Sequence, residues 1–188
     1  MDAPVIWMMG GPGSGKGTQS QKIERKYGYK HIDPIALMEQ EIASKTATGQ
    51  KFEEFQSKGV AVPLRELLPL IEHQLMSHRG GLKGIVIDGY PADLEEAEIL
   101  EDGFGAPSMI IALELAEEAG SQRSSLESGV QGRPSLSMYI DSSKAVMERY
   151  AQVALKIDAD QQPDSVFEEI QLSMDTFVKP HGSLHIAR

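Results

Sequence analysis

The chain contains no cysteine among its 188 residues. This absence excludes disulfide frameworks, cysteine-ligated metal centres and thiol nucleophiles. Long apolar runs are also missing, because no stretch approaches the roughly 20 residues that a membrane-spanning helix needs. The opening residues, 1–4, carry no basic segment of the kind that begins a secretory signal. We therefore expect a cytoplasmic protein that does not use a membrane as a partner.

Basic residues are outnumbered in this chain. The 18 Lys and Arg residues face 28 Asp and Glu residues, which gives a formal net charge of −10. An acidic chain has no general attraction for nucleic acid, so we expect no nucleic-acid partner. Apolar residues make up 40% and charged residues 24%, as in ordinary globular proteins. The length suits one domain, and we expect residues 1–188 to fold around a single core.

Short apolar runs alternate with helical patterns along the sequence. The patterns predict strands over 5–9, 30–32, 84–88, 108–113 and 153–157, and helices over 16–27, 35–44, 52–57, 63–76, 93–101, 141–150 and 163–177. Residues 129–137 are rich in Gly and Ser and predict a loop, and residues 178–188 predict a polar tail. Strands that alternate with helices predict an α/β fold with a parallel sheet covered on both faces.

A glycine-rich loop gives the strongest functional signal. The run Gly10-Gly11-Pro12-Gly13-Ser14-Gly15-Lys16 directly follows the first predicted strand and precedes the first predicted helix, which is the context of a phosphate-binding loop. Glycine dihedrals let successive backbone N–H groups point at phosphate oxygens, and the helix N-terminus and the lysine add positive charge. The alternative is a strand-to-helix turn without a ligand. The residues predicted to bind phosphate are Gly11, Gly13, Ser14, Gly15, Lys16, Gly17 and Thr18.

This loop, with Gly17-Thr18 after the lysine, resembles that of the adenylate kinase family in its short cytosolic form. The likeness continues in order through residues 26–32, 58–64, 84–91, 157–160 and 164–167. It implies a P-loop NTPase-like fold with a five-stranded parallel sheet, an AMP-binding-like segment over about 33–63 and a short lid over about 128–138. The implied reaction is reversible phosphoryl transfer from MgATP to AMP, so ATP and Mg²⁺ are the implied cofactors.

The resemblance also implies roles for single residues. Lys16, Asp88, Arg123 and Arg133 match catalytic positions on the ATP side. The two arginines fall in lid motifs that read Gln-Arg and Gly-Arg. Asp88 would approach Mg²⁺ only through a bound water, so no direct metal ligand is predicted.

The AMP side departs from the family pattern. The arginine that holds the AMP phosphate falls on Glu39, a second falls on Ala92, and the adenine-reading glutamine falls near Glu96. A carboxylate repels a phosphate instead of pairing with it. In the lid, Glu127 stands where another arginine is expected, and residues 134–152 are shorter than the family segment by about three helical turns. The pattern indicates a degenerate AMP site and a shortened lid.

Three functions fit these residues. The first is a nucleotide-binding relative of adenylate kinase, a pseudoenzyme that acts as a binding or structural module. A protein partner is compatible with this function. The second is an active nucleoside monophosphate kinase. The third is a structural subunit of a larger assembly, in which the nucleotide site is vestigial. Family members with degenerate sites often occur in cilia or flagella, so that location is an alternative to the general cytoplasm. The five histidines share no spacing with carboxylates that would indicate a metal site.

Overall fold

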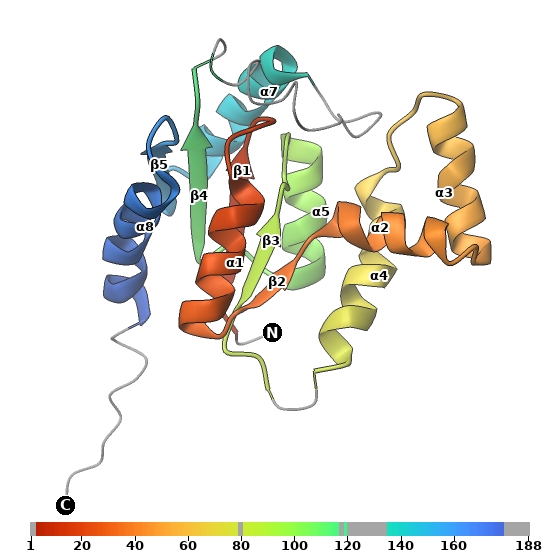
Figure 1. The fold of residues 1–188 in the computed structure, drawn as a ribbon, viewed down its shortest axis with the longest axis horizontal. Coiled ribbons are helices and arrows are strands. Elements are labelled where there is room, and N and C mark those ends of the chain that lie inside the picture. The colour runs from red at the N-terminus through yellow and green to blue at the C-terminus, as the bar shows by residue number, and fades with distance from the viewer. Residues whose placement is uncertain (1–2, 79–80, 117–118, 120–134, 179–188) are drawn as a thin grey trace, which may run out of the picture.

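The computed structural model of the chain describes residues 3–78, 81–116, 119 and 135–178. Its strands form one parallel sheet of five, in the order β2-β3-β1-β4-β5 (Figure 1). The strands are β1 (Val5–Gly10), β2 (Lys30–Ile32), β3 (Ile85–Asp88), β4 (Met109–Glu114) and β5 (Ala154–Asp158). The α/β fold predicted from the alternating pattern is confirmed.

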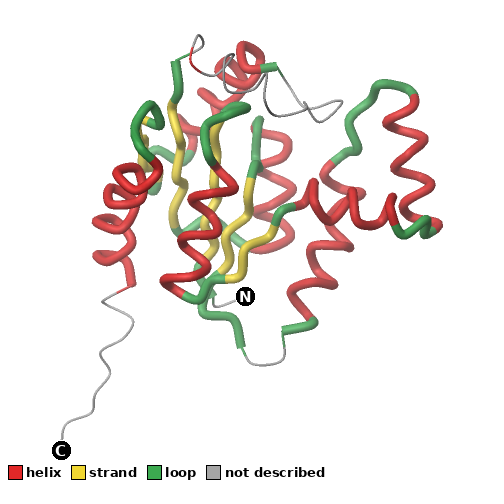
Figure 2. The backbone as a smooth tube through the Cα atoms, viewed as in Figure 1, coloured by secondary structure: helices red, strands yellow, loops and turns green. Residues whose placement is uncertain are grey.

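Helices cover both faces of this sheet (Figure 2). They are α1 (Lys16–Tyr27), α2 (Pro34–Ala43), α3 (Ala47–Ser57), α4 (Leu64–Met76), α5 (Leu94–Phe104), α7 (Leu136–Arg149) and α8 (Pro163–Val178). On one face, α1 and α8 pack through Ile23 and Ile170. On the other, α4, α5 and α7 pack through Leu67, Leu100 and Val146. In the described part of the chain, no helix has both the length and the apolar character needed to cross a bilayer.

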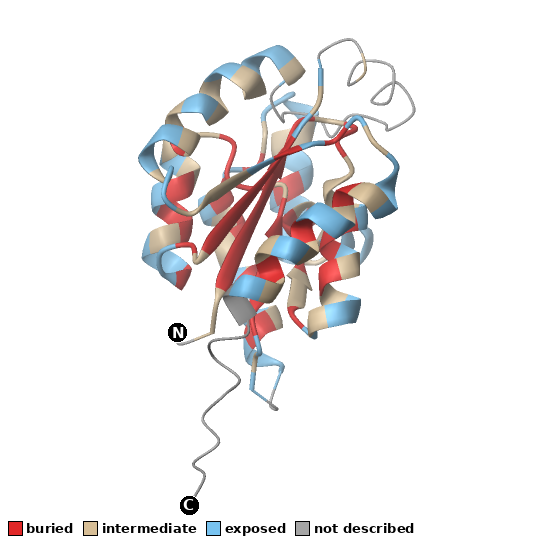
Figure 3. Ribbon diagram, turned by 90° about the vertical axis from the view of Figure 1, so that its left-hand side faces the viewer, coloured by how far each residue is buried: buried red, intermediate tan, exposed pale blue. Residues whose placement is uncertain are grey.

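The central strand β1 supplies both cores. All six of its residues are buried, and Figure 3 shows the buried strands between helices whose outer sides are exposed. Ile6 and Met8 point into the core under α1 and α8, whereas Trp7 and Met9 point into the other. A strand that is buried on both faces needs a continuous apolar run rather than an alternating one. This requirement explains why the run over 5–9 predicts the strand correctly.

Two helices begin earlier than the sequence pattern predicts. Helix α3 begins at Ala47 instead of residue 52, because the hydroxyl of Thr46 accepts a hydrogen bond from the backbone N–H of Gly49 at 2.9 Å. Helix α7 begins at Leu136 instead of residue 141, and Ser135 caps it in the same way at 3.4 Å. Thr and Ser are good N-caps, so their presence in a polar stretch favours a helix start as much as a loop.

The earlier start of α7 corrects one predicted boundary. The loop predicted over 129–137 is wrong at its end, because residues 136 and 137 are helical. Residues 136–138 of the predicted lid form the first turn of α7, and Ser135 caps it. The rest of the predicted lid, residues 128–134, lies outside the described residues. The predicted tail lies outside them from residue 179 onward.

Gly49 is the point at which α3 meets α2, and it offers a test of this packing. A Cβ atom at position 49 would collide with the backbone carbonyl of Glu41, whereas a Cβ at Gly103 in α5 would meet only Leu68, at 3.8 Å. We expect Gly49→Ala to lower the free energy of unfolding by about 1–3 kcal/mol, because backbone atoms must move. The matched control Gly103→Ala should leave it unchanged or raise it by up to about 1 kcal/mol. Urea denaturation of both variants measures the difference, and equal effects would contradict the packing.

Candidate nucleotide-binding site

The loop between β1 and α1 has the backbone of a phosphate cradle. Gly13 and Gly15 have φ angles of 76° and 90°, a left-handed region that glycine adopts without strain. The loop closes on itself through a hydrogen bond from the N–H of Ser14 to the carbonyl of Gly11, at 3.2 Å. A side chain at Gly10 would collide with Ser14. Glycines at these positions therefore permit a tight turn that ends at the N-terminus of α1, where N–H groups attract anions.

Two side chains of the loop suit a bound phosphate. The ammonium Nζ of Lys16 donates to the carbonyl of Gly11 at 3.0 Å, so this charge is held over the loop. The hydroxyl of Ser14 is buried and has no hydrogen-bond partner among the described residues. Leaving a buried polar group unpaired costs about 1–3 kcal/mol. A phosphate oxygen would accept from both groups, so the residues present fit the phosphates of a nucleotide.

Parallel pairing places Asp88 beside this loop. Met8 of β1 lies opposite Asp88, the last residue of β3. The carboxylate Oδ2 lies 3.6 Å from the place that a Cβ at Gly17 would occupy, and Cε of Lys16 lies 3.7 Å from the equivalent place at Gly89. The structure therefore brings together Lys16 and Asp88, two of the four residues that the resemblance implies as catalytic.

Asp88 has a partner that the sequence analysis missed. The ring Nε2 of His31 lies 2.8 Å from Oδ2 of Asp88, and the two side chains are only 12% and 7% exposed. Burial by itself lowers the pKa of His31, but the hydrogen bond and the negative charges of Asp88, Asp33 and Glu24 outweigh it and raise the pKa above 6.5. His31 thus carries charge more readily than an exposed histidine. One signal in the sequence could have indicated this contact, because His31 and Asp88 both lie at or near the ends of predicted strands.

On the acceptor side, several polar residues stabilise the starts of helices. Asp33 accepts a hydrogen bond from the N–H of Ala36 at 3.0 Å, and Pro34 occupies the first position of α2. Glu96 accepts from the N–H of Ala92 at 2.7 Å, while Asp93 accepts from the N–H of Glu96 at 2.8 Å. Asp93 is therefore the N-cap of α5, and the carboxylate of Glu96 is engaged by the N–H of the residue before this cap.

The position of the second AMP arginine is closed as well as uncharged. Ala92 is only 3% exposed. The hydroxyl of Ser142 in α7 donates to the carbonyl of Ala92 at 2.7 Å, so α7 is fastened to this loop. Glu39, by contrast, is exposed on α2.

The lid arginines cannot be placed. Arg123 and Arg133 lie outside the described residues, as does Glu127. The roles that the resemblance implies for them stay predictions.

Comparison with known proteins decides the family. A family model described as adenylate kinase matches residues 8–156. The chain belongs to the adenylate kinase family. Adenylate kinase isoenzyme 1 of Homo sapiens is 32% identical over 182 residues, which cover 91% of this chain and 94% of that protein. Adenylate kinase isoenzyme 1 of Cyprinus carpio is 31% identical over 185 residues, covering 93% and 95% of the two chains.

A third relative, adenylate kinase 1 of Drosophila melanogaster, is 29% identical over 189 residues, which cover 95% of this chain and 82% of that protein. The family named from the loop and its companion motifs is therefore confirmed. Membership makes this an adenylate-kinase-like nucleotide-binding chain.

The pair formed by His31 and Asp88 predicts a pH dependence of stability. Because the pKa of His31 is higher in the folded chain than its ordinary value of 6.5, its charge stabilises the fold fully below that pH. The contribution is lost as pH rises through the folded value. We expect the free energy of unfolding to fall more in the wild type than in His31→Gln between about pH 6 and pH 9.

Urea denaturation across this range measures the effect. The control His73→Gln, at an exposed position on α4, should follow the wild type. Parallel profiles for the wild type and His31→Gln would show that the pair does not titrate as described.

Proposed function

We propose that this chain binds ATP with Mg²⁺ through the loop 10–18, and that its phosphoryl transfer to AMP is weak or absent. In this proposal, the protein acts as a binding or structural module built on a kinase fold. The observation that carries the proposal is an asymmetry between the two halves of the site. The phosphate loop is complete, whereas position 92 of the acceptor half is buried beneath α7.

The donor half has the groups that ATP needs. The N–H groups of the loop and the N-terminus of α1 would face the phosphates, and the hydroxyl of Ser14 would donate to an oxygen. Lys16 would leave the carbonyl of Gly11 and pair with the outer phosphates. Bound Mg²⁺ would neutralise charge on the phosphate oxygens. Asp88, which His31 holds at 2.8 Å, would face the water shell of such an ion.

The acceptor half lacks the means to align AMP. Phosphoryl transfer depends on positioning both substrates and cancelling their charge. A charge-assisted hydrogen bond contributes about 1.5–3 kcal/mol, and each 1.4 kcal/mol is worth about tenfold. Losing two arginine contacts therefore weakens AMP binding by roughly a hundredfold or more. The exposed carboxylate of Glu39 adds repulsion to this loss.

Removing the loop's charge tests ATP binding. We expect Lys16→Ala to weaken ATP about tenfold or more, because a charge-assisted contact is lost. Lys26→Ala, an exposed position on the same helix α1, is the matched control and should bind ATP as the wild type does. Isothermal titration of the three proteins gives the constants. Equal affinity in all three would favour a vestigial nucleotide site in a structural subunit.

A second prediction addresses AMP. We expect Glu39→Arg to bind AMP about tenfold more tightly than the wild type, because a repulsive charge becomes a partner for phosphate. The control Glu53→Arg makes the same change of charge at an exposed position on α3 and should have little effect. Calorimetric AMP titration measures the affinities.

The rate of ADP formation measures turnover in the same proteins. We expect the wild type to remain far below the roughly 10 s⁻¹ that is typical of competent enzymes. Wild-type turnover at or above that rate, with tight AMP binding, would make the chain an active nucleoside monophosphate kinase instead.

A further inference from the structure

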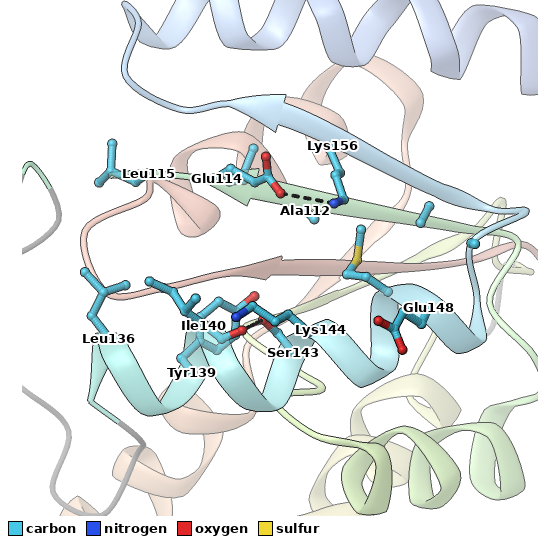
Figure 4. Close-up of a pocket in the computed structure, with 15 residues that line it drawn as sticks. Ala112, Glu114, Leu115, Leu136, Tyr139, Ile140, Ser143, Lys144, Glu148 and Lys156 are labelled. Atoms are coloured by element: carbon cyan, nitrogen blue, oxygen red, sulfur yellow. Dashed lines mark hydrogen bonds and ion pairs between the residues drawn. The ribbon is translucent and has the colours of Figure 1, made fainter. Parts of the chain in front are cut away.

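A cavity of about 580 Å³ lies between α7 and the strands β4 and β5. Figure 4 shows its two walls, with Ile140 and Ser143 on the helix facing Ala112 and Glu114 on the strand. This volume falls within the roughly 300–1,000 Å³ of small-molecule sites in proteins. The nucleotide half-sites described above do not account for it, although it extends to Gly11 at the edge of the phosphate loop.

The cavity exists because small side chains form its floor. Ala112 of β4 and Ala154 of β5 line it, whereas the larger Leu155 and Ile157 of β5 pack into the opposite core. Helix α7 contributes Ile140 and Met147 to the other wall. The part of the cavity between these four side chains is therefore apolar, and its two walls do not meet. Apolar surface of this kind favours an apolar occupant over water.

Charged side chains gather at the rim. Lys156 lies 3.6 Å from Glu114, with the two side chains 61% and 60% exposed. Lys144 lies 3.2 Å from Asp141, and these two are exposed to a similar degree. Exposed pairs of this kind contribute about 0–1 kcal/mol, so either lysine can turn to a ligand at little cost. Glu114 and Glu148 line the same cavity and disfavour a ligand that carries several negative charges.

We propose that this cavity is a binding site for a small, mainly apolar molecule that carries a single anionic group. The apolar part of the ligand lies between Ala154 and Met147, and the anionic group reaches Lys144 or Lys156. The cavity borders the phosphate loop at Gly11, where the side chain of Leu136 lines the cavity and would collide with any side chain added to the glycine. The apolar part of the cavity, beyond Leu136, takes this ligand rather than ATP, so the proposal does not depend on the proposed function.

The first test uses 8-anilinonaphthalene-1-sulfonate, an aromatic fluorophore with one sulfonate, on the full chain. We expect saturable binding with a stoichiometry of one. Ala154→Leu should fill the cavity and weaken binding about tenfold or more. Ala36→Leu makes the same change at an exposed position on α2 and should have no effect. N-phenyl-1-naphthylamine, which lacks the sulfonate, should bind more weakly to the wild type.

Methyl NMR on methionine-labelled wild type provides a test that needs no variant. The resonance of Met147, which lines the cavity, should shift with the fluorophore. Met174, buried in the core on the other face of the sheet, should not. Shifts of equal size at both residues, or unchanged binding by Ala154→Leu, would overturn the proposal.

Competition with ATP separates the two sites. We expect saturating ATP to leave the fluorophore bound, and Lys16→Ala to lose ATP while it keeps the fluorophore. Displacement by ATP would show that the fluorophore occupies the nucleotide site and would refute the second site, while leaving the proposed function intact. Loss of ATP binding from the wild type with the fluorophore retained would refute the proposed function alone.

Discussion

Parallel pairing of β1 with β3 sets the position of every group in the donor half. Because Met8 lies opposite Asp88, β3 ends two residues before β1 does, and the loop after β1 passes beside the carboxylate that closes β3. The neighbouring strand β2 then brings His31 to the same edge, in register with Val86. Ligands of open α/β sheets bind at the carboxyl ends of the strands. The two buried cores hold these ends in place, so the loop has a fixed base on which to bind phosphate.

The acceptor half of the same edge is held together by hydrogen bonds to the backbone. Asp33 caps α2, Asp93 caps α5 while Glu96 accepts from the N–H of Ala92, and Ser142 of α7 donates to the carbonyl of Ala92. Each of these bonds satisfies a backbone donor or acceptor. In the proposed function, these contacts stand where the family pattern has groups that hold AMP.

The sequence was sufficient for the sheet and for the phosphate loop. Buried strands need continuous apolar runs, and the loop's glycines and lysine are adjacent in the chain, so both leave local signals. The contact between His31 and Asp88 joins residues that are 57 positions apart, and no local pattern encodes it. The hydrogen bond that joins Ala92 to Ser142 of α7 likewise links residues that are 50 positions apart. The early starts of α3 and α7 were missed because Thr46 and Ser135 occur in polar stretches that also suit loops.

The central claim is that one nucleotide site survives where the family reaction needs two. Calorimetric titration of the wild-type chain with ADP and Mg²⁺ tests it most directly, since ADP is the product at both sites of the family reaction and would fill each intact site. Loss of the acceptor half predicts a stoichiometry of one ADP per chain, bound at the phosphate loop. Two ADP molecules bound per chain with similar affinity would show that the acceptor half is intact and would contradict the account.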